Sequence, residues 1–480
     1  MRMFKSSLWG KLLAITLVVL LIALVLARIG FLVDERRGWQ QEAVRSVQQS
    51  QAGAQVVLGP WLHRACAEEW EVEVGEGKDR RVETQRREFR LQAAPQTLTV
   101  KSQAAAESRY RGLFKVNGYL TRLDLTAQWP ALDSLEPRAE TRGGRLGCGP
   151  VTLMLVVGDT RGVQRAELKV DDQPLAVSAG TEHPKHESGL HASLAPVAAG
   201  VPVKAELSLD LRGTGRLDLV PAAAQTEWDL RSDWPHPSFG GRFLPVEREV
   251  KDDGFHAVWR VSELASSAPR AVAEGVPLCM GDIDAGADAY AVPGAAASGP
   301  RCLDTLAVSF IDPVNPYVLA DRAVKYGLLF VALTFIAVAL TEVLAPKVRR
   351  VHPVQYALVG LALSLFFMLL LALSEHLRFE IAYAAASLAC AGVLGVYGSH
   401  MLGGWRAGAV FGASLGGLYG LLYVLLTREQ TALVVGTLGL FAAVAAVMLL
   451  TRRLDWYRLF DELSPAKAVA EAPMARARNE

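Results

Sequence analysis

The chain has 480 residues, enough for more than one domain, and 51% of them are hydrophobic. Its formal net charge of +1 lacks the basic excess typical of nucleic-acid binding, so we expect no nucleic-acid partner. Charged residues are concentrated in the first two thirds, whereas the part after Val324 is largely Leu, Ala, Val, Gly and Phe. This division predicts a water-facing domain attached to a membrane domain.

The first apolar run covers residues 12–33 and follows a short basic segment, residues 1–11. At about 1.5 Å per residue, a helix of this length crosses a hydrocarbon core about 30 Å thick. We interpret it as an uncleaved membrane anchor; the alternative is signal-peptidase cleavage at Val25–Ala27. The polar, helix-favouring segment 34–53 predicts a helical stalk that extends the anchor.

Residues 34–322 repeatedly alternate apolar and polar side chains, which is typical of half-buried β-strands. In the segment 205–213, Leu207, Leu209 and Leu211 fall on one face of such a strand. The pattern recurs at 89–93, 98–101, 166–170 and 215–220, and turn-forming residues separate the segments. The sequence therefore predicts a large, all-β, sandwich-like domain over residues 34–322.

Four of the five cysteines, Cys66, Cys148, Cys279 and Cys302, fall in this region, which permits two disulfides in an oxidising compartment. Cys279 and Cys302 flank a loop rich in Gly and Ala and form the candidate disulfide. The fifth, Cys390, lies in the middle of an apolar run and is interpreted as a small packing residue.

The stretch "SDWPHPSFGGRFLP" (232–245) brings an acid, a base and a nucleophile close together in sequence: Asp233, His236 and Ser238. A catalytic relay needs these groups to converge in space, normally from separate elements. Pro235 and Pro237 instead favour an extended chain in which neighbouring side chains diverge. We predict no catalytic residues here, and we interpret the stretch as a fixed extended segment that anchors apolar surface.

The segment "HPKHESGLH" offers His183, His186 and His191 as candidate metal ligands. Pro184 and Gly189 favour a loop, and no carboxylate or cysteine at a standard spacing completes a site. We predict neither a metal site nor a cofactor.

Five more apolar runs follow, at 323–345, 355–374, 379–398, 407–426 and 431–451. Because only short polar breaks separate them, they predict a compact antiparallel bundle over 323–451, followed by a tail at 452–480. Basic residues gather at alternate breaks, which predicts cytoplasmic termini and places 34–322 on the opposite side. Arg36 and Arg37 count against this orientation.

One of these runs carries a row of small residues, Gly408, Gly412, Gly416 and Gly420. Glycines four positions apart share a helix face and let a neighbouring helix approach closely. We interpret the row as bundle packing; the alternative is a mobile gate.

Polar groups near the ends of membrane helices form a candidate functional junction, because such groups are costly in lipid and often functional. It comprises Ser374, Glu375 and His376, together with Gln355 and Tyr356. One interpretation is that these are interfacial helix ends in contact with water or headgroups. The other is a proton-responsive or ligand-contacting site, since His376 could titrate near neutrality.

Several long blocks, in the same order, resemble the CreD family of inner-membrane proteins. The most specific is "SDWPHPSFGGRFLP", with the signature residues Asp233, Trp234, Pro235, His236, Pro237, Ser238 and Phe239. The others are "FLVDERR" (31–37), "QVVLGPWL" (55–62), "RYRGLFKVNGY" (109–119), "GDTRGV" (158–163), "GFHAVWRVSELA" (254–265), "HPVQYALVGLALSLFFMLLLALSEH" (352–376) and "TRRLDWY" (451–457). The segment "HRACAEEW" (63–70) departs from the family pattern and leaves the local fold near Cys66 open.

The resemblance implies a multi-pass protein of the bacterial inner membrane with its large domain in the periplasm. It also implies a role in cell-envelope integrity or stress response, expressed under a two-component system. The family's biochemical activity is not established, so the resemblance transfers no catalytic residues. We therefore expect a non-enzymatic binding or scaffolding protein; the alternatives are a transporter or lipid-handling protein and an envelope enzyme. The expected partners are the lipid bilayer, an unidentified periplasmic envelope component and, in a homo-oligomer, a second copy of the chain.

Overall fold

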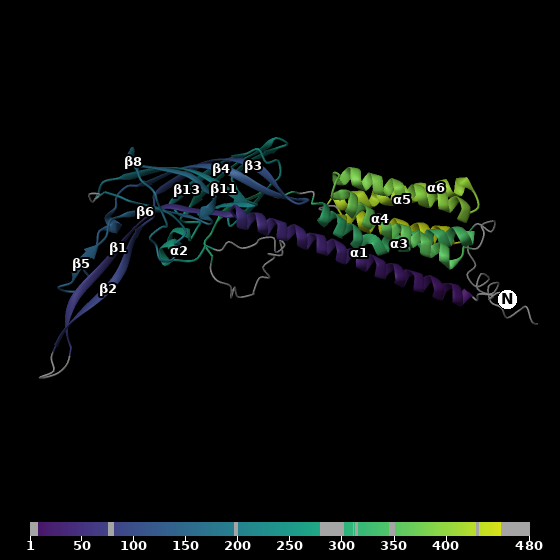
Figure 1. Ribbon diagram of the computed structural model, residues 1–480, viewed down its shortest axis with the longest axis horizontal. Coiled ribbons are helices and arrows are strands. Elements are labelled where there is room, and N and C mark those ends of the chain that lie inside the picture. Colours follow the sequence, from purple (N-terminus) through teal and green to yellow (C-terminus); the bar gives the residue numbers. More distant parts are fainter. Residues whose placement is uncertain are drawn as a thin grey trace, which may run out of the picture. The chain divides into compact units, whose positions relative to one another are not determined.

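The computed structural model describes residues 8–74, 81–195, 200–278, 302–310, 312, 315–344, 351–428 and 432–452. The chain divides into two compact units. A membrane unit comprises Met1–Gln40 and Val314–Glu480, and a β domain comprises Gln41–Pro313 (Figure 1).

The membrane unit contains six helices that are long and apolar enough to cross a bilayer, counted over the described residues. This confirms the six predicted spans and the α+β membrane architecture. The first, α1, runs without a break to Ser50, so the polar stalk segment continues the apolar anchor as one helix. The helices are α1 (Leu8–Ser50), α3 (Pro316–Leu344), α4 (Pro353–Ser374), α5 (Phe379–Met401), α6 (Trp405–Thr427) and α7 (Ala432–Thr451).

Close packing of α5 on α6 explains part of the glycine row. A Cβ atom on Gly408 would lie 2.5 Å from the carbonyl oxygen of Gly395, and one on Gly412 would lie 3.2 Å from the Gly395 Cα. Gly408 therefore requires glycine for helix contact, and Gly412 lies in a tight contact at the same interface. Gly416 and Gly420 face open space, so the predicted packing role is confirmed for only half of the row.

The two arginines that count against the predicted orientation are both paired with carboxylates inside the membrane unit. Arg36 lies 3.6 Å from Glu375, and Arg37 lies 3.4 Å from Asp321. Pairing offsets the positive charge at this end of the apolar run and reduces the cost that an uncompensated cation would carry near the lipid.

The β domain consists of two sheets packed face to face, which confirms the predicted sandwich-like fold. In the first sheet, the order is β14-β17-β12-β1-β6-β10-β9, and β2 and β5 also pair with β1. Its strands are β1 (Gln55–Val74), β2 (Arg81–Ala93), β5 (Arg145–Cys148), β6 (Thr152–Val157), β9 (Ser178–Ala179), β10 (Gly189–Ser193), β12 (Arg216–Leu219), β14 (Pro237–Gly241) and β17 (Leu306–Phe310).

The second sheet has the order β15-β16-β13-β3-β4-β11-β7-β8. Each of the five segments with predicted alternation lies wholly or largely within a strand of one sheet or the other. The strands of the second sheet are β3 (Thr97–Arg111), β4 (Phe114–Trp129), β7 (Val163–Val170), β8 (Gln173–Leu175), β11 (Val203–Thr214), β13 (Gln225–Ser232), β15 (Glu247–Lys251) and β16 (Gly254–Ser262).

Both sheets contribute to one large core, in which Trp228 stacks on Trp259. The opposite face of the first sheet is covered by the short helix α2 (Ala268–Glu274), which packs on Trp61 and Met154. Strand β1 is therefore buried on both faces along "VVLGPWL", which explains why this segment is continuously apolar and does not alternate.

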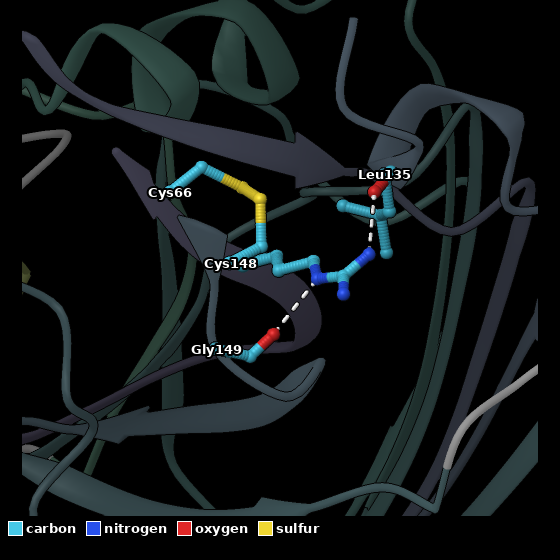
Figure 2. The surroundings of a disulfide bond; sticks show 5 residues. Cys66, Leu135, Cys148 and Gly149 are labelled. Carbon is cyan, nitrogen blue, oxygen red and sulfur yellow. Dashed lines mark hydrogen bonds between the residues drawn. A yellow bond between two sulfur atoms is a disulfide. The ribbon is translucent and has the colours of Figure 1, made fainter. Parts of the chain in front are cut away.

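A disulfide joins Cys66 of β1 to Cys148 of β5, directly opposite each other in the antiparallel register. Figure 2 shows the disulfide and the neighbouring Gly149, whose carbonyl oxygen accepts from Arg64 Nε at 2.8 Å. The segment whose sequence departs from the family pattern is thus an ordered part of β1. The candidate disulfide between Cys279 and Cys302 includes Cys279, which lies outside the described residues.

Candidate functional site: the α1 joint

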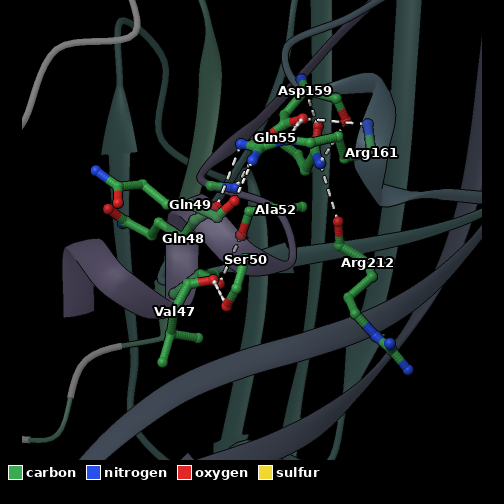
Figure 3. A network of polar contacts seen from close by, with 11 residues as sticks. Val47, Gln48, Gln49, Ser50, Ala52, Gln55, Asp159, Arg161 and Arg212 are labelled. Atoms are coloured by element: carbon green, nitrogen blue, oxygen red, sulfur yellow. Dashed lines mark hydrogen bonds and ion pairs between the residues drawn. The ribbon is translucent and has the colours of Figure 1, made fainter. Parts of the chain in front are cut away.

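The last carbonyl groups of α1 are bound by a side chain from a distant part of the β domain. Arg161, in the short helix η3 (Thr160–Gly162), donates from Nη1 to the Gln49 carbonyl and from Nη2 to the Gln48 carbonyl at 3.2 Å (Figure 3). Terminal helix carbonyls have no partners within the helix and carry the negative end of its dipole. A guanidinium at this point donates hydrogen bonds to these carbonyl oxygens and offsets the negative end of the helix dipole.

Asp159 holds this arginine in place. Its carboxylate accepts from Arg161 Nε at 2.9 Å and Nη2 at 2.6 Å, and also from the backbone N–H of Gly53 at 3.1 Å. Burial alone would raise the pKa of Asp159, but the hydrogen bonds from Arg161 and Gly53 outweigh it and lower that pKa. The carboxylate is therefore ionised at neutral pH.

Gln55, the first residue of β1, connects this turn to the second sheet. Its fully buried amide donates from Nε2 to the carbonyl oxygens of Asp159 at 3.0 Å and Arg212 at 2.9 Å. Its Oε1 accepts from the Asp159 N–H at 3.1 Å. Gly162 must lack a side chain, because a Cβ atom there would collide with the Arg212 carbonyl and the Gln55 amide.

We call this group the α1 joint, defined by Gln48, Gln49, Gln55, Asp159, Arg161 and Arg212. It links the end of α1 to a strand of each sheet through the charge-assisted hydrogen bonds of Arg161, whose side chain is 54% exposed, and through those of the buried Gln55 amide. Such bonds are stronger than neutral exposed ones and hold one geometry. Because all six residues belong to the β domain unit, the joint fixes the last turn of α1 within that unit.

The stretch "SDWPHPSF" crosses from one sheet to the other, so its acid and its nucleophile are placed on different sheets. Asp233 Oδ1 accepts from the Ala106 N–H of β3 at 2.7 Å, whereas Ser238 pairs with Ser309 in the first sheet. Trp234 is buried, and its Nε1 donates to the His236 carbonyl at 2.9 Å. The stretch thus connects the two sheets and buries Trp234.

The residues grouped as a candidate junction lie at opposite ends of α4. Gln355 and Tyr356 are in its first turn, and Ser374 is its last residue. Because a helix rises 1.5 Å per residue, the two groups are separated by about 27 Å, and they do not form one site. Glu375 pairs with Arg36, while Gln355 Oε1 accepts the His352 N–H in a capping box.

The histidines of "HPKHESGLH" lie with His63 in one buried cluster of the β domain. The ring of His183 is 5.6 Å from that of His63 and 5.2 Å from that of His186. His191 bonds through Nδ1 to the Gly180 carbonyl at 2.8 Å. Among the described residues, no group of three or more His, Cys, Asp or Glu side chains is arranged to hold a metal ion.

Two of these rings accept hydrogen bonds and are therefore neutral. Arg90 Nη1 donates to His63 Nδ1 at 2.7 Å, and the backbone N–H of Lys185 donates to His183 Nδ1 at 3.3 Å. Burial, with the neighbouring His186 and Arg90, lowers the pKa of His183 to about 4. Burial also lowers the pKa of His63 and His186.

Acid should destabilise the β domain through this cluster. The pKa of His183 is lower in the folded state than the value of about 6.5 expected when unfolded, so its contribution is complete above pH 6.5. Between about pH 6.5 and 4 the domain should lose about 3 kcal/mol of unfolding free energy. Urea unfolding of the full chain at a series of pH values measures this loss.

The variant His183→Asn isolates the source of the acid sensitivity, because an amide oxygen can accept from the Lys185 N–H without titrating. It should flatten the stability profile below pH 6.5, whereas the control His236→Asn, which changes an exposed histidine outside this cluster, should not. An equal slope in His183→Asn and the unsubstituted chain would show that His183 is not responsible.

Sequence reasoning did not identify the α1 joint as a site. Its members Gln55 and Asp159 are 104 positions apart, and neither lies in a pattern with an expected chemistry. The available signal was the pair of blocks "QVVLGPWL" and "GDTRGV", which the family resemblance already singled out.

Comparison with known proteins decides the family. The family model described as "Inner membrane protein CreD" matches residues 7–457. The chain belongs to the CreD family. The inner membrane protein CreD of Escherichia coli (strain K12) is 33% identical to it over 460 residues, covering 95% of each chain. The resemblance inferred from the sequence blocks is therefore confirmed, and the chain is a multi-pass inner-membrane protein.

Solved structures with similarity to the chain include two of an M1 zinc metallopeptidase from Deinococcus radiodurans. They are 9% and 7% identical to it and cover 35% of this chain and 38% of theirs, with TM-scores of 0.20. At this level the similarity carries no argument about the CreD-family chain.

Proposed function

We propose that this CreD-family chain maintains cell-envelope integrity by binding or scaffolding an envelope component, without catalysis. In this proposal both termini are cytoplasmic and the β domain is periplasmic. The Cys66–Cys148 disulfide supports that side, because disulfides persist in the periplasm and are rare in the cytosol. The basic residues at alternate breaks between spans support the same orientation.

The α1 joint is the observation that carries the proposal. Helix α1 continues as one element from its apolar run to the β domain, where Arg161 binds its terminal carbonyls. The joint therefore holds the end of α1 inside the β domain, and in this proposal a load on that domain reaches the membrane span along the continuous helix. Asp233, the acid of the stretch closest to a catalytic pattern, has a structural role instead, since its carboxylate accepts a hydrogen bond from the Ala106 N–H.

The test is complementation of a strain that lacks the chain, with envelope integrity as the readout. Arg161→Gln should abolish complementation at normal abundance, because it frees the end of α1 from η3. The matched control is Arg165→Gln, which removes an exposed arginine paired with Glu167 on the adjacent strand β7 and should complement normally. Normal complementation by Arg161→Gln, or its loss in His236→Ala with the protein folded, would contradict the proposal.

A further inference from the structure

The hairpin formed by β3 and β4 projects beyond its neighbours in the second sheet. Strand β13 pairs with β3 only as far as Ala104, and β11 pairs with β4 only as far as Gly118. The two hairpin strands continue to pair with each other up to Arg111 and Phe114. Residues 107–117 thus form a two-stranded extension beyond the strand pairing with β13 and β11, which we call the finger (Figure 1).

The end of the finger exposes apolar and aromatic side chains. Tyr110 lies on the row of β3 that faces the core further back, at Val100 and Ala104, yet 69% of it is exposed. Leu113, in the two-residue turn, is 56% exposed. Gly112 has a φ of +61°, as the first position of a type II′ turn requires, so the tip has a fixed shape.

Charge accompanies this apolar surface. Residues 108–115 contain Arg109, Arg111 and Lys115 and no acidic residue. Arg111 is exposed, Arg109 is part-exposed and pairs with Glu107, and Lys115 donates to Asp312 at 3.0 Å. Basic side chains beside an amphipathic aromatic ring and a leucine suit the headgroup region of an anionic lipid surface.

The connection of the chain places the finger at the end of the β domain that leads to the membrane. Asn117 Nδ2 donates to the carbonyl oxygen of Phe310 at 3.3 Å, and Lys115 pairs with Asp312. Asp312 is followed after only three residues by Pro316, the first residue of the membrane helix α3. Four residues extend over at most about 14 Å, so the base of the finger is tethered close to the start of a span.

We propose that the finger is a lipid-binding element that inserts Tyr110 and Leu113 into the bilayer interface while Arg109 and Arg111 bind anionic phospholipid headgroups. It gives the β domain a third attachment to the membrane, besides its covalent connections to α1 and α3. This proposal does not depend on which side of the membrane the domain occupies.

The test uses the full chain reconstituted in vesicles of phosphatidylethanolamine, with or without phosphatidylglycerol. The variant Leu113→Cys is labelled with an environment-sensitive maleimide fluorophore, and lipids with a nitroxide quencher on the acyl chain report contact. The matched control is Leu264→Cys, a 95% exposed leucine. It follows β16 at the opposite end of the sheet, where Ser262 pairs with Gln225. The unsubstituted chain, treated with the same reagent, gives the labelling background.

We expect severalfold stronger quenching at position 113 than at position 264, and more with phosphatidylglycerol than without. Arg109→Gln with Arg111→Gln should remove the dependence on phosphatidylglycerol, and added salt should weaken it. Equal quenching at the two positions would overturn the proposal, whether it is strong or absent. Quenching at 113 that ignores phosphatidylglycerol would overturn the role of the arginines.

Discussion

Loss of the Cys66–Cys148 disulfide should lower the unfolding free energy of the β domain by about 4.5 kcal/mol. The two cysteines are 82 positions apart, and a cross-link over a loop of this length removes much of the conformational entropy of the unfolded chain. The measurement is urea unfolding of Cys66→Ser with Cys148→Ser in the full chain. Tryptophan fluorescence is a suitable signal, because Trp61, Trp129 and Trp228 are fully buried in this domain.

Two controls separate the cross-link from the loss of the thiol groups. A reductant should destabilise the unsubstituted chain more than the double variant. Cys390→Ala, which changes the free cysteine buried in the bundle, should leave the β-domain transition in place. A midpoint in the double variant equal to that of the unsubstituted chain would show that β1 and β5 hold their register without the bond.

The second large effect should come from Gln55→Leu in the α1 joint. Leucine has a similar volume but leaves the carbonyl groups of Asp159 and Arg212, and the N–H of Asp159, without their partner. Each buried polar group left unsatisfied costs about 1–3 kcal/mol, so we expect a loss of about 4 kcal/mol. Hydrogen exchange should become faster at the end of α1 and in η3 before it changes in the core.

The matched control is Gln103→Leu, which makes the same substitution at an exposed position of β3. It should alter the midpoint by no more than about 0.5 kcal/mol, as is usual for surface positions. If Gln55→Leu behaves like this control, the joint does not hold α1 through the glutamine amide.

The elements of the fold follow from local patterns. Each membrane span is a run of about twenty apolar residues, and elements of a water-soluble domain do not need an apolar run of this length. Strands such as β11 are predictable from the sequence, because one face packs on the core at Leu207 and Leu209 and the other face is in contact with water. Strand β1 gave no such signal, because α2 covers its second face and the sequence there is apolar throughout.

The arrangement of side chains in the candidate sites depends on contacts that no local pattern encodes. The histidine cluster is completed by His63, which lies 120 positions before His183, and the joint connects residues from α1, β1, η3 and β11. The grouping of residues in the candidate junction was wrong because sequence position alone did not show how far apart they lie in space. Gln355 and Glu375 are near each other in sequence, but the helix between them carries them to opposite ends.

The strand order of the first sheet constrains how the protein is made. Strand β1 pairs with β12, and β12 pairs with β17, whose last residue is Phe310. At about 5–20 residues per second, the ribosome takes roughly 10–50 s to travel from the start of β1 to that point. Until that point β12 lacks one of its two partners in the described part of the chain, so this edge of the first sheet stays unpaired. Because β14 pairs only with β17 among the described strands, it joins the first sheet only after β17 has been made.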